Sequence, residues 1–301
     1  METYNIKDLY KEIGTINNYF NENQETQIAR IQKLPIHKYC HYRNNSENGK
    51  CNDYFEMASS GVIHLLKTLK KYVSDYDKLA EYTILWLSYK LNRHSKYSET
   101  NLNEFYTKYI EKNNDYNKKI NDDDGLTYKD IINRKKNLMD MNINEISKHY
   151  GPFNILFYLY YIFPDEYPYC SDRLGLAKSF VDQFKVLNND SKNIEGSLYT
   201  QILSTLSNDY KNLKNMYHDY KHCDFLPLSE LTPKKIPVDI SEKLSAQPTT
   251  LSSEATSSSS SILKTVIPGL STFSVIPAFL GIAYKTIYKK TIKKSKEENE
   301  T

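Results

Sequence analysis

The most constraining feature of this sequence is a run of nineteen residues without a charge, from Val266 to Tyr284. As an α-helix the run is about 28 Å long, close to the thickness of the hydrocarbon core of a bilayer, and helices of soluble cores rarely stay uncharged for so long. Pro268 and Pro277 interrupt it, but proline is tolerated in a bilayer helix. We therefore expect one transmembrane helix over residues 264–285; a buried hairpin of a soluble protein is the alternative.

The orientation of this helix is predicted by the lysines that follow it directly: Lys285, Lys289, Lys290, Lys293, Lys294 and Lys296. Lys and Arg close to a span favour the cytosolic side. We therefore expect a single-pass protein in contact with the lipid bilayer, with a short basic cytosolic tail at 286–301 and a non-cytosolic N-terminal domain. The residues after Met1 are polar and show no apolar signal region, so we expect the C-terminal span to direct insertion.

The segment before the predicted helix, residues 227–263, is of low complexity. It is rich in Pro, Ser, Thr and Lys, and it contains five consecutive serines from Ser257 to Ser261. Such a composition buries too little apolar surface to offset the entropy lost on ordering. We expect a disordered stalk that separates residues 1–226 from the bilayer.

The N-terminal part, residues 1–226, shows helical periodicity throughout. Apolar residues recur at i, i+3 and i+4 over residues 6–20, 55–69, 79–91, 102–110, 128–139, 143–163, 174–184 and 199–217, and alternation with a period of two is missing. Asp53 and Glu56 are spaced as a capping box. The helix with Trp86 and Leu87 is apolar on most sides, so we expect these residues and Leu206 in the core. The predicted fold class is all-α, a multi-helix bundle.

Four short motifs occur in one order along this chain. Ile84 to Asn92 reads ILWLSYKLN, Leu102 to Tyr106 reads LNEFY, Ile202 to Ser207 reads ILSTLS, and Phe279 to Lys285 reads FLGIAYK. In this order and spacing the sequence resembles the Plasmodium interspersed repeat (PIR) proteins, and its rodent-parasite branch most closely, over about residues 40–290.

The resemblance implies a variant antigen of a malaria parasite, exported to the parasite surface or to the infected host cell. It implies a role in host-cell interaction and immune evasion, with an unknown host protein or host-cell surface ligand, and antibodies, as partners. Relatives that resemble this chain usually carry cysteines where Val62 and Phe157 stand here. If those two positions are normally bridged, their joint loss leaves no odd thiol.

Four cysteines remain, and an even number suits two disulfides on the non-cytosolic side. Of the three connectivities, we favour Cys40 with Cys51, which closes a short polar loop, and Cys170 with Cys223, which ties a helix start to the end of the last helix. Free thiols are the alternative, because the oxidising compartment is itself inferred from the predicted topology.

Clusters of possible metal ligands lack the required spacing. His37, Cys40, His41 and Cys51 form one group and His218, His222 and Cys223 another, but neither combines CxxC with HxxxH. The run Asp122 to Gly125 lacks the alternating ligands and distal Glu of a calcium loop. We expect no metal and no other cofactor.

Enzymatic motifs are missing as well: the sequence contains no GxGxxG, GxxxxGK[ST], HExxH or GxSxG. The formal net charge of +3 on 301 residues, explained by the basic tail, gives no electrostatic footprint for nucleic acid. We expect binding without catalysis and no nucleic-acid partner.

For recognition, we expect two polar segments to be exposed, Pro35 to Lys50 and Asn113 to Gly125. A tyrosine-rich stretch is a second candidate surface, although packing in the core is the better interpretation. Its members are Tyr158, Tyr160, Tyr161, Tyr167 and Tyr169. The alternative function is a tail-anchored trafficking or membrane-tethering factor with a cytosolic helical domain, but the lysine-rich C-terminus and the lack of long heptads argue against it.

Overall fold

The computed structural model describes residues 5–17, 19–20, 35–42, 50–93, 101–121, 125–162, 170–219 and 223–235. The chain divides into two units, Met1–Ser245 and Ala246–Thr301, and every described residue belongs to the first. The predicted anchor (Val266, Pro277, Tyr284), the basic tail and the stalk from residue 236 onward lie outside the described residues. Within these ranges no helix has the length and the apolar composition that crossing a bilayer requires.

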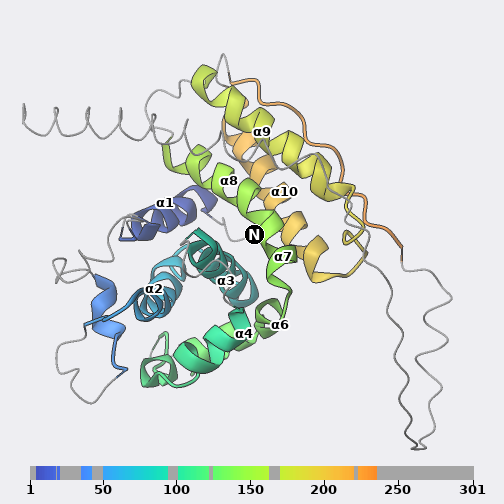
Figure 1. Ribbon diagram of the computed structural model, residues 1–301. Coiled ribbons are helices and arrows are strands. Elements are labelled where there is room, and N and C mark those ends of the chain that lie inside the picture. Colours follow the sequence, from blue (N-terminus) through green and yellow to red (C-terminus); the bar gives the residue numbers. More distant parts are fainter. Residues whose placement is uncertain are drawn as a thin grey trace, which may run out of the picture. The chain divides into compact units, whose positions relative to one another are not determined.

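The described residues are helical and contain no strand beyond two isolated bridges, Lys119 with Thr127 and Ile194 with Lys234, so the all-α prediction is confirmed for them. In Figure 1, α8 lies between α1 and the pair α9 and α10. The elements are α1 Ile6–Asn17, η1 Pro35–Tyr39, α2 Tyr54–Leu69, α3 Tyr76–Arg93, α4 Leu102–Phe105, η2 Tyr106–Ile110, η3 Asn114–Asn117, α5 Tyr128–Asn133, α6 Lys136–Met139, α7 Ile143–Ile146, η4 Ser147–His149, α8 Tyr150–Ile162, α9 Ser171–Asn188 and α10 Leu198–Met216.

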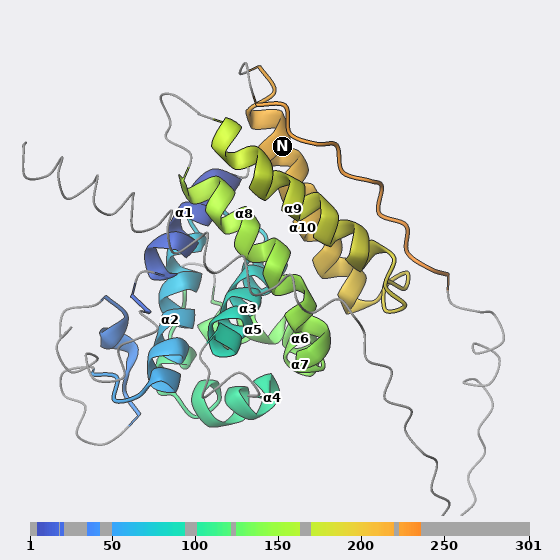
Figure 2. The same cartoon turned by 45° about the horizontal axis from the view of Figure 1, so that its top comes forward.

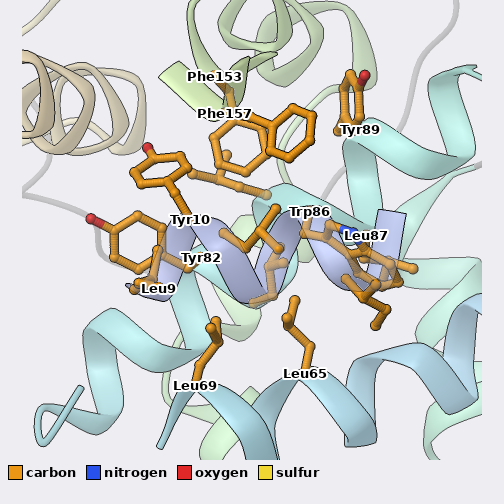
Figure 3. Packing of buried hydrophobic residues seen from close by; sticks show 14 of the residues in the cluster. Leu9, Tyr10, Leu65, Leu69, Tyr82, Trp86, Leu87, Tyr89, Phe153 and Phe157 are labelled. Carbon is orange, nitrogen blue, oxygen red and sulfur yellow. The ribbon is translucent and has the colours of Figure 1, made fainter. Parts of the chain in front are cut away.

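The centre of the core is Trp86 on α3, which is fully buried (Figure 3). Its indole N–H donates to Asn17 Oδ1 at 3.1 Å, and its ring meets Phe20 edge to face at 5.4 Å. Gly61 on α2 makes this packing possible, because a Cβ there would lie 2.6 Å from the Trp86 ring. Leu87 and Leu206 are also fully buried.

The start of α2 shows why the chain turns into a helix here. Asp53 Oδ1 accepts the N–H of Glu56 at 2.8 Å, as the predicted capping box requires. The second half of the box differs, because Glu56 Oε2 accepts the N–H of Asn52 at 2.7 Å and not that of Asp53. The cap therefore spans one residue more and ties Asn52, next to Cys51, to the helix.

Two predicted helices are divided differently in the structure. The helix expected at 128–139 is interrupted at Arg134 and Lys135 into α5 and α6. The helix expected at 143–163, for which Gly151 and Pro152 predict a break or kink nearby, is interrupted just before them, at the 3₁₀ turn η4. These two residues lie in the first turn of α8, where proline removes no intrahelical hydrogen bond.

The predicted stalk begins at Pro227, but in the structure residues 223–235 run in extended form along α9 (Figures 1 and 2). Phe225 is fully buried, and Leu228 and Leu231 pack against the core. Because these apolar side chains find partners on the helices, the first nine residues of the predicted stalk belong to the folded domain.

Candidate functional site

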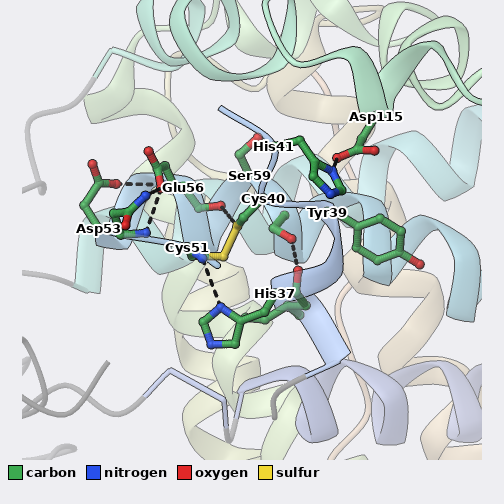
Figure 4. Close-up of a disulfide and its surroundings, with 12 residues drawn as sticks. His37, Tyr39, Cys40, His41, Cys51, Asp53, Glu56, Ser59 and Asp115 are labelled. Atoms are coloured by element: carbon green, nitrogen blue, oxygen red, sulfur yellow. Dashed lines mark hydrogen bonds and ion pairs between the residues drawn. A yellow bond between two sulfur atoms is a disulfide. The ribbon is translucent and has the colours of Figure 1, made fainter. Parts of the chain in front are cut away.

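The two segments predicted to be exposed loops pack against each other, and this joint surface is the candidate functional site. Asn113 joins them, because its Nδ2 donates to the carbonyl of Tyr39 at 3.1 Å and its Oδ1 accepts the N–H of Asp115 at 2.9 Å. His41 Nδ1 lies 2.5 Å from Asp115 Oδ2 (Figure 4). Residues some 74 positions apart in sequence therefore present one surface.

The disulfide Cys40–Cys51 joins a residue within the first segment to the residue directly after it, with a Cα–Cα distance of 5.1 Å (Figure 4). The N–H of Cys51 donates to His37 Nδ1 at 3.1 Å, and Cys40 Sγ lies 3.5 Å from the carbonyl oxygen of Glu56. On the other side, Ser60 Oγ on α2 donates to the carbonyl of Ile36. The segment is thus closed by a disulfide and attached to α2 by polar contacts.

The second segment is attached to α2 through Tyr116, which is fully buried. Its hydroxyl donates to the carbonyl of Ser59 at 2.7 Å, and burial raises the pKa of this tyrosine well above its ordinary value. Asp115 beside it has a side chain only 2% exposed, and its charge is paired with Lys118 Nζ at 2.6 Å as well as with His41. The buried carboxylate is satisfied by the ammonium of Lys118 and by the imidazole of His41.

The prediction that these segments are exposed is wrong for many of their described residues. Ile36, His37, Tyr39 and Cys40 are buried in the first, and Asn113, Asp115, Tyr116 and Ile120 in the second. Their apolar and hydrogen-bonding side chains point inward and hold the segments. Eight exposed positions, all except Lys50 and Gly125, are called here the paired surface: Pro35, Lys38, His41, Asn114, Asn117, Lys118, Lys119 and Asn121.

An aromatic cluster that no sequence pattern indicated borders the paired surface. Tyr42, Phe55 and Tyr109 are half-buried, with ring centroids 5.1 Å apart for Phe55 and Tyr109 and 6.1 Å for Tyr42 and Tyr109. Tyr109 lies in η2, a π-helical turn in which the N–H of Glu111 donates to the carbonyl of Tyr106. Single π turns are frequent at functional sites. The wider turn is hidden in a sequence pattern that fits an ordinary α-helix.

The tyrosine-rich stretch divides between core and surface. Tyr160 is fully buried and its hydroxyl donates to the carbonyl of Asp209 at 2.6 Å, whereas Tyr161 is 39% exposed. Tyr158 packs partly buried against the core. Tyr167 and Tyr169 lie outside the described residues. The described part of the stretch is mainly a packing element of α8.

The possible metal ligands are engaged otherwise. Cys40, Cys51 and Cys223 are in disulfides, and the second of these, Cys170–Cys223, has a Cα–Cα distance of 4.8 Å. Both bonds have the predicted connectivity. Among the described residues, no group of three or more His, Cys, Asp or Glu side chains is arranged to hold a metal ion. His222 and the acidic run 122–124 lie outside the described residues.

A buried acid on α10, Asp209, is the centre of a polar cluster that the sequence did not indicate. Tyr10 Oη donates to its Oδ2 at 2.9 Å, and Tyr82 Oη donates to both carboxyl oxygens at 2.9 and 2.8 Å. Burial raises the pKa of Asp209 to about 7, although both tyrosine hydrogen bonds act in the opposite direction. Because the carboxyl is closed off from solvent, the cluster serves to join α1 and α3 to α10.

The fold therefore defines an all-helical domain with two disulfides and buried polar clusters that join its helices. The family model of the Plasmodium variant antigen proteins Cir/Yir/Bir matches residues 10–285, and the chain belongs to this family. Among solved structures, the chain is similar to a Plasmodium PIR protein ectodomain, with 31% sequence identity and a TM-score of 0.58. That match covers 75% of this chain and 99% of the other. No curated protein matches the sequence.

Proposed function

We propose that this chain is a membrane-anchored variant antigen, displayed on the parasite or the infected host cell, whose helical domain acts by contact with a host protein or with antibodies. Family membership is the observation that carries the proposal. The two disulfides support a non-cytosolic domain, because such bonds persist in oxidising compartments. The uncharged run 266–284 and the lysines after it supply the anchor and its orientation.

The paired surface is the part of the domain that we assign to recognition. Its buried neighbours hold it in place through Tyr116, which bonds to α2, and through the Cys40–Cys51 disulfide. Two of its exposed residues, His41 and Lys118, pair with the buried carboxyl of Asp115. Substitution at the other exposed positions removes no partner of this buried carboxyl, as a variable surface requires. The half-buried rings of Tyr42 and Tyr109 beside it offer the rigid aromatic contacts that dominate many interfaces.

The test is an exchange of surface residues between two family members. The exposed residues of the paired surface, except His41 and Lys118, are replaced by those of a relative with different antibody reactivity. His41 and Lys118 are kept because they pair with the buried Asp115, and Ile36, Tyr39, Asn113 and Tyr116 are kept as well. We expect antibody and host-cell binding to follow the exchanged residues, with helicity and melting temperature unchanged. The matched control exchanges exposed residues of α9, namely Lys178, Asp182, Lys185 and Val186. Recognition that follows the α9 residues instead would contradict the assignment.

A further inference from the structure

Residues 223–235, called here the strap, are attached to the domain at two places. From Cys223 the strap follows α9 in the same direction as the helix, from its first residue toward its last (Figure 2). Near its start, Phe225 is buried and the carbonyl of Leu226 accepts the hydroxyl of Tyr210 at 3.0 Å. The strap is the last described part of the chain before the segment that leads to the predicted anchor.

The attachment at the far end, called here the clamp, consists of hydrogen bonds made by two asparagines and of one that the N–H of Glu195 donates to the carbonyl of Lys234 at 2.9 Å. Asn188 receives the N–H of Thr232 on Oδ1 at 2.9 Å and donates from Nδ2 to the carbonyl of Glu230 at 2.7 Å. The carbonyl of Asn193 accepts the N–H of Lys234 at 2.8 Å, and Asn193 Nδ2 donates to the carbonyl of Asn188 at 2.8 Å. Asn193 is fully buried. These bonds hold residues 230–234 against the turn between α9 and α10.

The attachment at the near end is covalent. Cys223 is bonded to Cys170, the residue directly before α9, over a sequence separation of 53. Both half-cystines are buried, at 1% and 4% exposure. The bond encloses α9, the following turn and α10 in one closed loop of chain. Tension applied beyond residue 235 therefore has a covalent route to Cys170 that bypasses both helices.

We propose that the strap and the Cys170–Cys223 bond form a force-bearing device that keeps α9 and α10 out of the path of a force applied through the C-terminal anchor. The clamp opens first and lets the strap peel back as far as Cys223. The disulfide then transfers the tension to Cys170 and onward toward α8, so the closed loop is not extended. This inference rests on the proposed function in one respect: the force arises because a membrane anchor holds the C-terminal end while the domain is bound to a partner.

The test is optical-tweezers pulling on the full chain, with handles on both termini and the disulfides oxidised. We expect a short transition at low force, from opening of the clamp, before the main unfolding of the domain. In the variant Asn188→Ala/Asn193→Ala this first transition moves to lower force, while the main transition stays in place. Asn189→Ala is the matched control, because the exposed side-chain amide of Asn189 makes no hydrogen bond to the strap among the described residues. Its backbone carbonyl, which accepts Lys234 Nζ at 3.4 Å, is kept in the variant.

Removal of the covalent attachment by Cys170→Ser/Cys223→Ser places α9 and α10 in the force path. We expect the fully extended length to grow by about 19 nm, from 53 residues at about 3.5 Å each, and α10 to open before the rest of the domain. Reductant on the unaltered chain also opens Cys40–Cys51, and the 11 further residues bring the growth to about 22 nm. The proposal is overturned if no transition precedes the main one, or if the clamp variant and the Asn189→Ala control behave alike. The pulling experiments measure force and extension and involve no binding partner. A negative result would therefore overturn the force-bearing device without contradicting the proposed function.

Discussion

Replacement of the buried acid, Asp209→Asn, should change how the stability of this domain depends on pH. Asn keeps the shape of the side chain and an oxygen that accepts a hydroxyl of Tyr10 or Tyr82, but it does not titrate. The wild-type carboxyl has a pKa raised by burial to about 7 in the folded state, against about 3.9 in the unfolded chain. The folded state therefore holds this proton more tightly than the unfolded state does.

The direction of the pH effect follows from that difference. The contribution of Asp209 to stability is fully present below about pH 4, is lost as the pH rises toward 7, and stays constant above it. One pKa unit corresponds to about 1.4 kcal/mol, so the loss between pH 5 and pH 8 is about 2 to 3 kcal/mol. The asparagine variant has no such loss, and it should gain that amount relative to wild type over the same interval.

The comparison with the variant is necessary because other buried groups act in the opposite direction. Burial lowers the pKa of His149 and of His64 to about 4, so both histidines make the folded state more stable as the pH rises from about 4 to 6.5. Their effects and that of Asp209 partly cancel in the wild-type curve. The difference between wild type and Asp209→Asn removes the histidines and isolates the carboxyl.

The assay is urea unfolding followed by circular dichroism at pH 5, 6, 7 and 8, with the disulfides oxidised. The control is Asp182→Asn on α9, whose carboxyl is 61% exposed and paired with Lys178, and its difference from wild type should be flat with pH. A difference for Asp209→Asn that is equally flat between pH 5 and pH 8 would show that the buried carboxyl does not titrate near neutrality and would refute the reasoning.

Three further predictions concern the core and the disulfides. Trp86→Ala should destabilise the domain by about 3 to 5 kcal/mol, measured by chemical unfolding, and a loss below about 1 kcal/mol would contradict the central place of this ring. Gly61→Ala should cost about 1 to 3 kcal/mol, because the new Cβ meets the Trp86 ring at 2.6 Å; unchanged stability would show that the ring can move. Non-reducing peptide mapping should recover the disulfides Cys40–Cys51 and Cys170–Cys223. Removal of Cys170–Cys223 should lower the free energy of unfolding by about 4 kcal/mol and removal of Cys40–Cys51 by about 3 kcal/mol, because the first bond closes the longer loop. If all four cysteines react with an alkylating reagent in the native protein, the two disulfides are not formed and the prediction is contradicted.

The long helices could be predicted from the sequence because each has a strong pattern of its own. The apolar positions around Trp86 and around Leu206 recur with helical spacing, and the ends of α2 and α3 lie within three residues of the expected ones. The cap at Asp53 is likewise local, since it depends on residues three positions apart. Structural features that depend on a pattern within about twenty residues can therefore be predicted from a single sequence.

The candidate site could not be predicted in the same way, because its parts come together from distant positions. Polar residues around Asn113 indicate a loop, but only the fold shows that Asn113 reaches the carbonyl of Tyr39. The stalk boundary could not be predicted for the same reason. Pro227 and its neighbours have the composition of a linker, and the asparagines that hold the strap, Asn188 and Asn193, lie some forty residues earlier.

The central claim is that the helical domain is displayed outside the cytosol, with the C-terminus inside. The measurement that tests it most directly is protease treatment of intact infected cells that carry the protein with a tag before Met1 and another after Thr301. The account predicts that external protease removes the first tag and leaves the second protected. Degradation of the tag after Thr301 while the N-terminal domain stays protected would contradict it.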